Sequence, residues 1–248
     1  MKADPFVQAR LLELQALDTR LQQIEHARSR VPAIAQLAEA ERSLQQVSDD
    51  VVRVETSLSD IRREVSRAET DVQQVRDRAA RDQERLDAGA GMTARDLTSL
   101  QHELESLARR QGDLEEVELE AMERQEAAEE RLTERTAEQQ RMQGEVDRLT
   151  GERDEAVAEL DSEREGVVAK REGLAGGIDD ALIALYDRIR EFSGGLGAAE
   201  FTHGRCGGCR LELNPVDVAT IEKAPVDEVV RCEECGRILV RILAPAQA

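Results

Sequence analysis

Apolar residues recur at a regular spacing along residues 37–86. One row steps by seven positions from Leu37 to Leu86, and a second row from Val47 to Val75 lies three or four positions from the first. Charged and polar residues fill most of the positions between them. This spacing puts one apolar stripe on a helix and is the a/d pattern of a coiled coil. The two rows are Leu37, Leu44, Val51, Leu58, Val65, Val72, Ala79 and Leu86, and Val47, Val54, Ile61, Ala68 and Val75.

The apolar rows stop at Asp87, where alanines and glycines follow, and a second pair of rows begins at Leu97 and extends to Leu174. Thr93 is a good helix N-cap with Asp96 three residues later, as in a capping box. Two helices of similar length with a short capped tip near residues 87–93 predict an antiparallel coiled-coil hairpin. The alternative is a separate parallel dimer through each helix. The middle of the second seam is polar and rich in alanine, which predicts thin packing there.

The ends of the chain carry shorter elements. An N-terminal helix should cover residues 5–29, with a break near residues 30–32 because proline disfavours helix at the residue before it. Glycines from residue 173 end the long helix, and a short apolar-faced helix is expected over residues 178–192. We therefore expect a mainly α fold, with a hairpin domain at residues 1–175 and a short helix and a small β zinc ribbon at residues 176–248.

Composition supports long helices rather than a thick core. Charged residues make up 35% of the chain and aromatic residues 2%, and aromatic side chains normally supply much of a compact core. The net charge is −19; residues 111–172 alone carry 9 basic and 21 acidic side chains. The sequence has no cluster of basic residues of the kind that binds phosphate backbones. Its acidity therefore favours a protein partner over nucleic acid.

Two cysteine pairs, each with two residues between its members, lie near the C-terminus. In each pair the two cysteines can present thiolates from one tight turn, and two such pairs make a tetrahedral site for zinc. Four thiolates close the coordination shell, so the ion should be structural and not catalytic. A redox-active dithiol is the weaker alternative, and His203 is read as a surface residue. The predicted ligands are Cys206, Cys209, Cys232 and Cys235.

Arginines flank both cysteine pairs: Arg205 and Arg210 beside the first, Arg231 and Arg237 beside the second. One interpretation is that they offset the negative charge of a zinc ion with four thiolates. The other is that they contact nucleic acid or an acidic partner.

No arrangement of residues typical of an enzyme is apparent, and we expect no enzymatic activity. Asp87 and Asp96 flank the hairpin tip and could deliver carboxylates to another enzyme, although Asp96 is better explained as a helix-start residue. No apolar run approaches the ~18 residues of a membrane span, and the first residues lack a signal-peptide pattern. We therefore expect a cytoplasmic protein without membrane contact.

The whole pattern resembles a bacterial family that joins a coiled-coil hairpin to a C4-type zinc ribbon, described as predicted nucleic-acid-binding zinc-ribbon proteins. The resemblance implies zinc at the four cysteines, and chaperone-like roles in flagellar or secretion contexts for some members. It rests on residues 14–18, the Pro32 break, the tip at residues 92–103, residues 185–189, the two cysteine pairs, and residues 235–239.

We expect a non-enzymatic adaptor or scaffold that binds a protein partner. The alternative is a nucleic-acid-binding protein that acts through the arginine-flanked ribbon. Self-association stays open beside both.

Overall fold

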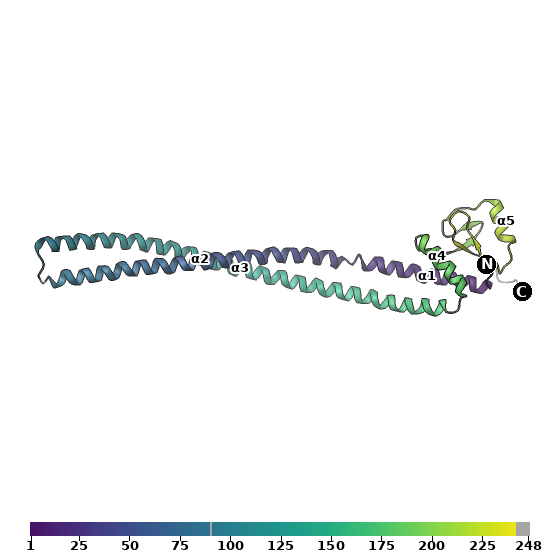
Figure 1. The fold of residues 1–248 in the computed structure, drawn as a ribbon, viewed down its shortest axis with the longest axis horizontal. Helices are drawn as coiled ribbons and strands as arrows, with labels where there is room; N and C mark the ends of the chain where they lie inside the picture. The colour runs from purple at the N-terminus through teal and green to yellow at the C-terminus, as the bar shows by residue number, and fades with distance from the viewer. Residues whose placement is uncertain (90, 242–248) are drawn as a thin grey trace. The chain divides into compact units, whose positions relative to one another are not determined.

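The computed structural model describes residues 1–89 and 91–241 (Figure 1). Contacts divide the chain into two compact units: the ribbon unit, Met1–Ile34 with Gly151–Ala248, and the hairpin unit, Ala35–Thr150. The domain boundary expected at residue 175 stays a prediction. The helices are α1 Pro5–Arg28, α2 Pro32–Ala88, α3 Ala94–Ala175, α4 Asp180–Phe192 and α5 Pro215–Lys223, and the strands are β1 Ala198–Thr202, β2 Arg205–Cys206, β3 Val230–Arg231 and β4 Ile238–Arg241.

The hairpin unit is the predicted antiparallel coiled coil of α2 and α3. Ion pairs between the helices fix their direction, since residue numbers rise on one helix as they fall on the other: Arg62 with Glu129 at 2.8 Å and Arg76 with Glu115 at 2.6 Å. The predicted seam supplies the buried side chains. These include Val51, Leu58, Val65, Ala68, Val72 and Val75 of α2, and Leu100, Leu107, Ala121 and Leu149 of α3.

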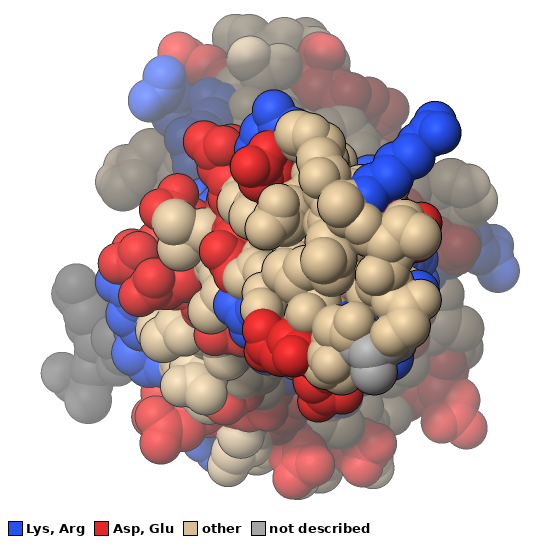
Figure 2. Space-filling view, turned by 90° about the vertical axis from the view of Figure 1, so that its left-hand side faces the viewer, with Lys and Arg blue, Asp and Glu red and all other residues tan. Residues whose placement is uncertain are grey.

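The hairpin tip begins and ends as the sequence predicts. Gly89 and Gly91 adopt positive φ angles of 55° and 77°, which glycine tolerates without the clash of a Cβ atom. The Asp96 carboxylate accepts hydrogen bonds from the backbone N–H of Thr93 at 3.0 Å and from its hydroxyl at 2.7 Å, and these bonds lower the pKa of Asp96. Figure 2 faces this end of the hairpin unit, where uncharged side chains gather at the centre and charged ones surround them.

The break before Pro32 is also confirmed. Helix α1 begins after Asp4, whose carboxylate accepts from the N–H of Phe6, and ends at Arg28 with Ser29 as its cap. Helix α2 then begins with Pro32, where the missing N–H costs nothing. Within the described residues, no helix has both the length and the apolarity needed to cross a membrane.

The ribbon unit contains a small mixed sheet. In the described part of the chain the strand order is β2-β1-β4-β3. Strand β1 pairs in parallel with β4, placing Ala198 beside Ile238, while β2 and β3 pair antiparallel at the two edges. Strand β4 ends at Arg241, which is the last described residue.

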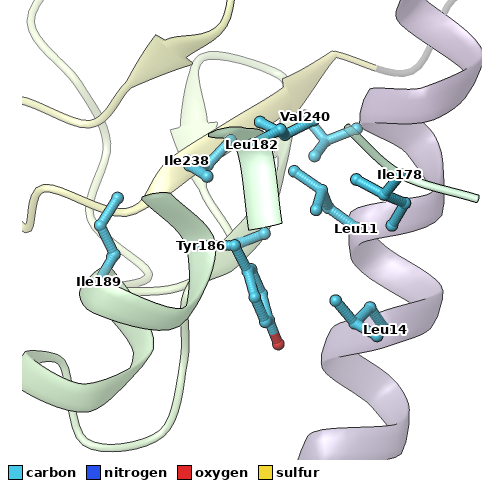
Figure 3. Packing of buried hydrophobic residues seen from close by; sticks show 9 residues of the cluster. Leu11, Leu14, Ile178, Leu182, Tyr186, Ile189, Ile238 and Val240 are labelled. Atoms are coloured by element: carbon cyan, nitrogen blue, oxygen red, sulfur yellow. The ribbon is translucent and has the colours of Figure 1, made fainter. Parts of the chain in front are cut away.

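Strand β4 is buried on both faces and separates two hydrophobic cores. Because side chains alternate along a strand, Ile238 and Val240 face one core while Leu239 faces the other. The first core joins the sheet to α1 and α4 and contains Leu11, Leu14, Leu182 and Tyr186 (Figure 3). The second core lies around the cysteines and contains Phe201, Leu213 and Ile221.

A buried polar network borders the first core. The Asp18 carboxylate is 1% exposed. It accepts hydrogen bonds from Arg171 Nε at 2.6 Å and from the Tyr186 hydroxyl at 2.7 Å, and Arg190 lies 3.4 Å away. Burial and the bond to Asp18 raise the pKa of Tyr186, so the hydroxyl stays a donor. Three helices, α1, α3 and α4, are therefore held together through one carboxylate.

Gln15, one turn before Asp18, ties α1 to the start of β1. Its side-chain oxygen accepts from the N–H of Gly197 at 2.6 Å, and its nitrogen donates to the carbonyl of Gly195 at 2.9 Å. Each partner is a backbone group in the linker between α4 and the sheet. Buried backbone groups need hydrogen-bond partners, and Gln15 supplies them to two backbone groups of the linker that leads into the ribbon.

We predict that Asp18→Ala destabilises the ribbon unit by about 3 kcal/mol, because it leaves the Arg171 guanidinium and the Tyr186 hydroxyl without their buried acceptor. Asp187→Ala is the matched control. Asp187 also contacts Arg171, at 2.9 Å, but its side chain is 41% exposed, so its loss should cost less than about 1 kcal/mol. The measurement is urea unfolding followed by the fluorescence of Tyr186, the only tyrosine in a chain without tryptophan. Equal losses in both variants would contradict the role of Asp18.

Candidate metal centre

The two cysteine pairs lie in two turns with the same hydrogen bonding. In the first, the N–H of Arg210 donates to the carbonyl of Cys206 at 2.8 Å; in the second, the N–H of Gly236 donates to the carbonyl of Cys232 at 2.8 Å. The N–H groups of the two leading cysteines also match, since each donates to a carbonyl five residues ahead. These turns point both pairs of thiols inward.

The residue after each turn has a left-handed backbone. Gly236 has a φ angle of 72°, and Arg210, at the equivalent place in the first turn, has a φ angle of 63°. Glycine adopts this conformation freely, whereas an L side chain there costs about 1–2 kcal/mol. The second turn therefore uses the residue that fits its backbone, and the first carries an arginine despite the strain.

The four sulfur atoms lie at the corners of a site that fits zinc. All four are within 4.8 Å of one another. The Sγ atoms of Cys206 and Cys235 are 3.8 Å apart, and those of Cys209 and Cys232 are 3.9 Å apart. Sulfurs at about 2.3 Å from a tetrahedral zinc are about 3.8 Å from each other. A disulfide needs about 2.05 Å, so the arrangement is a C4 site for one structural zinc ion.

Burial makes ionisation of the leading cysteine of each pair dependent on a nearby cation. Cys206 and Cys232 are fully buried, and burial raises the pKa of both, that of Cys232 to about 12. Burial also opposes ionisation of Cys235, but hydrogen bonds from Arg237, together with those from the Cys232 and Cys206 thiols, outweigh it and lower the pKa of Cys235 to about 7. Zinc binds thiolates, so it supplies the positive charge that lets all four sulfurs lose their protons together.

The four flanking arginines fall into two groups. Arg237 is half-buried and donates to the carbonyls of Ser193 at 2.6 Å and Leu196 at 3.1 Å. Arg231 donates to the carbonyl of Gly236 at 2.8 Å. These two side chains hold backbone in place.

Arg205 and Arg210 form the second group. Both are exposed, and in the described part of the chain no carboxylate lies within ion-pair distance of either. They are therefore free to contact another molecule. Whether they do stays a prediction.

His203 and the tip carboxylates lie outside the metal centre. His203 is exposed in the turn between β1 and β2 and is not part of the cysteine cluster. Asp96 is engaged by Thr93, and Asp87 accepts from the Gln83 amide at 2.8 Å. Both carboxylates therefore serve their own helices.

One supporting residue was missed at the level of sequence. Arg241, at the end of β4, donates to carbonyls around the C-terminus of α5, including Ala224 at 2.8 Å, Pro225 at 2.8 Å and Glu228 at 2.7 Å. A cation at the end of a helix satisfies carbonyls that have no partner within the helix. Nothing in the apolar pattern of β4 distinguishes this arginine, because its partners lie 13 to 20 residues earlier.

Comparison with known proteins gives two family matches. Residues 14–194 match the family described as CT398-like coiled coil hairpin domain, and residues 205–239 match the C4-type zinc ribbon domain. The uncharacterized protein Rv2229c of Mycobacterium tuberculosis is 37% identical over 242 residues, which cover 98% of each chain.

Solved structures agree with these matches. A Mycobacterium smegmatis protein aligns with a TM-score of 0.85 and 36% identity, covering 97% of this chain and 100% of the other. CT398 from Chlamydia trachomatis aligns with a TM-score of 0.68 over 95% of this chain and 98% of its own, at 18% identity. The second likeness shows the fold alone.

We predict that Cys232→Ser abolishes stoichiometric zinc binding, measured by elemental analysis of protein purified without chelator. The Tyr186 fluorescence should also change, since β4 faces both the cysteine core and the Tyr186 core. Helical circular dichroism should change little, because the hairpin unit has its own seam. His203→Ala is the control and should retain the metal. A Cys232→Ser protein with full zinc content would refute the ligand assignment.

Proposed function

The chain belongs to the family of CT398-like coiled-coil hairpin proteins that carry a C4-type zinc ribbon, and on that basis we propose that it is a non-enzymatic adaptor that binds a protein partner. The zinc site supports this proposal through its ligand set. Four cysteines leave no coordination position for water or substrate, so the ion shapes the ribbon and takes no part in a reaction.

The observation that carries the proposal is the amount of exposed surface. The chain exposes 16387 Å², whereas a compact monomer of 27.6 kDa exposes about 11,000 Å². The hairpin unit accounts for such a surplus, because paired helices bury only a seam. A chain with this much exposed surface for its mass is suited to contacting other molecules.

Charge favours protein over nucleic acid as the main partner. The net charge is −19, and residues 111–172 carry 21 acidic and 9 basic side chains. Phosphate backbones would be repelled from such a surface, while a basic or mixed protein surface would be attracted. Binding to duplex or single-stranded nucleic acid normally depends on a clustered positive face.

The adaptor proposal predicts that the full-length chain, tagged and returned to its source organism, retains a defined protein at constant stoichiometry. The complex should survive nuclease treatment. Native mass spectrometry measures the stoichiometry. Loss of every retained protein after nuclease treatment, or retention of none in the untreated sample, would contradict the proposal.

A second candidate function is supported by Arg210. This residue keeps a charged, exposed side chain at a strained backbone position where the equivalent residue is Gly236. Strain of this kind often marks a functional position. Arg205 and Arg210 flank the first cysteine pair, and exposed guanidinium groups at these positions are suited to phosphate or to a carboxylate.

For this candidate we predict that labelled single-stranded RNA binds at low salt and that Arg205→Ala with Arg210→Ala weakens binding at least tenfold. The slope of binding against salt concentration should also become shallower. The matched control is Arg30→Ala with Arg188→Ala, which removes the same charge from exposed arginines outside the zinc ribbon. Equal loss in both double variants would show a general charge effect and reject a site at the ribbon.

A further inference from the structure

A groove opens along the middle of the hairpin unit, and we call it the arm groove. Its volume is about 560 Å³, and its walls are residues 50–61 of α2 and residues 124–135 of α3. The groove therefore lies where the sequence predicts thin packing in the second seam.

The floor of the arm groove is apolar because the seam is incompletely filled. Val51 and Leu58 of α2 are 7% and 2% exposed. Val54 and Ile61, which alternate with them along the seam, are only half-buried and line the groove. Ala128 of α3 also lines it, and a methyl group is too small to fill the hole that a coiled-coil knob normally occupies.

The edges of the arm groove are basic on an otherwise acidic helix. Arg53, Arg124, Arg131 and Arg135 line it together with a single acidic residue, Asp50. Three of these arginines are among only nine basic residues in the segment 111–172, against 21 acidic ones. The net charge of the groove lining is thus opposite in sign to that of residues 111–172 of α3.

One of the arginines is unpaired. Arg124 pairs with Glu64 at 2.8 Å, Arg135 with Glu138 at 2.6 Å, and Arg53 with Asp50. Among the described residues, Arg131 has no hydrogen-bond or ion-pair partner. An exposed guanidinium beside an apolar floor is arranged to receive a carboxylate from outside.

We propose that the arm groove binds an amphipathic helix of a partner protein, with acidic residues on both sides of its apolar stripe. The stripe would cover Val54, Ile61 and Ala128 as the third helix of a local bundle, and its carboxylates would pair with Arg131 and its neighbours. This inference rests on the proposed adaptor function and names the surface and the partner chemistry. A second copy of this chain is disfavoured as occupant, because two molecules of charge −19 repel each other.

The test uses the full-length protein and a labelled 21-residue helical peptide with Leu and Ala at its seam positions and Glu on both flanks. A peptide with Lys in place of Glu is the charge control. Fluorescence anisotropy at low salt should show binding of the Glu peptide and at least tenfold weaker binding of the Lys peptide.

Two substitutions locate the binding. Arg131→Glu should weaken binding of the Glu peptide at least tenfold, whereas Arg109→Glu, on an exposed face of α3 outside the groove, should leave it unchanged. Ala128→Leu should also weaken binding, because it fills the floor, and should maintain or raise the melting temperature of the hairpin. Weaker binding by a variant that is at least as stable excludes unfolding as the cause.

Failure of the groove and failure of the adaptor function give different results. No binding of the Glu peptide, or equal binding by the wild type and both groove variants, contradicts the proposal that the arm groove binds an acidic helix. If Ala128→Leu retains every protein that the wild type retains from its own organism, the groove is also rejected while the adaptor function stands. If the wild type retains no protein, the adaptor function itself fails.

Discussion

Four cysteine sulfur atoms lie within 4.8 Å of one another. As thiolates they need a cation among them, and the ribbon depends on this constraint. The core around the cysteines has one aromatic side chain, Phe201, and a few aliphatic ones. Such a small core cannot hold its fold by burial alone. The bond energy of zinc to four sulfurs replaces the missing hydrophobic contribution. It also joins two turns that lie 22 residues apart in the sequence, between Cys209 and Cys232.

Strand β4 carries the effect of the metal centre to the rest of the ribbon unit. It follows the second cysteine turn directly, and its two faces belong to two different cores. Through Ile238 and Val240 it packs with Tyr186, whose hydroxyl reaches Asp18 of α1. The N-terminal residues join the same unit, since the N–H of Val229 donates to the carbonyl of Met1 at 3.0 Å. The metal centre, the sheet and α1 therefore belong to one compact unit, and the hairpin unit has a separate seam.

Features with a local signal were predictable from the sequence. The seven-residue rows predict the hairpin, Thr93 and Asp96 predict the start of α3, and Pro32 predicts the start of α2, because each signal acts within a turn or two of helix. The spacing of the cysteines likewise predicts a zinc site, even when the strands around it are not known. The comparisons and the geometry confirm the family combination, the fold class and the zinc site.

Features that depend on distant partners were not predictable. Asp18 looks like any other acid on a charged helix, yet its partners Arg171 and Tyr186 lie more than 150 residues away and bury it. Arg237 was grouped with three other arginines by its position, whereas the fold turns it toward backbone carbonyls. The parallel pairing of β1 with β4 joins strands about 40 residues apart, and short strands carry no sequence signal for their partner.

The central claim is that one zinc ion bound by four cysteine sulfurs holds the ribbon together. X-ray absorption at the zinc edge of the protein as purified measures the ligands of the metal directly. We predict a single shell of four sulfur atoms at about 2.3 Å. A shell containing nitrogen or oxygen ligands, or a different metal in the site, would contradict the account.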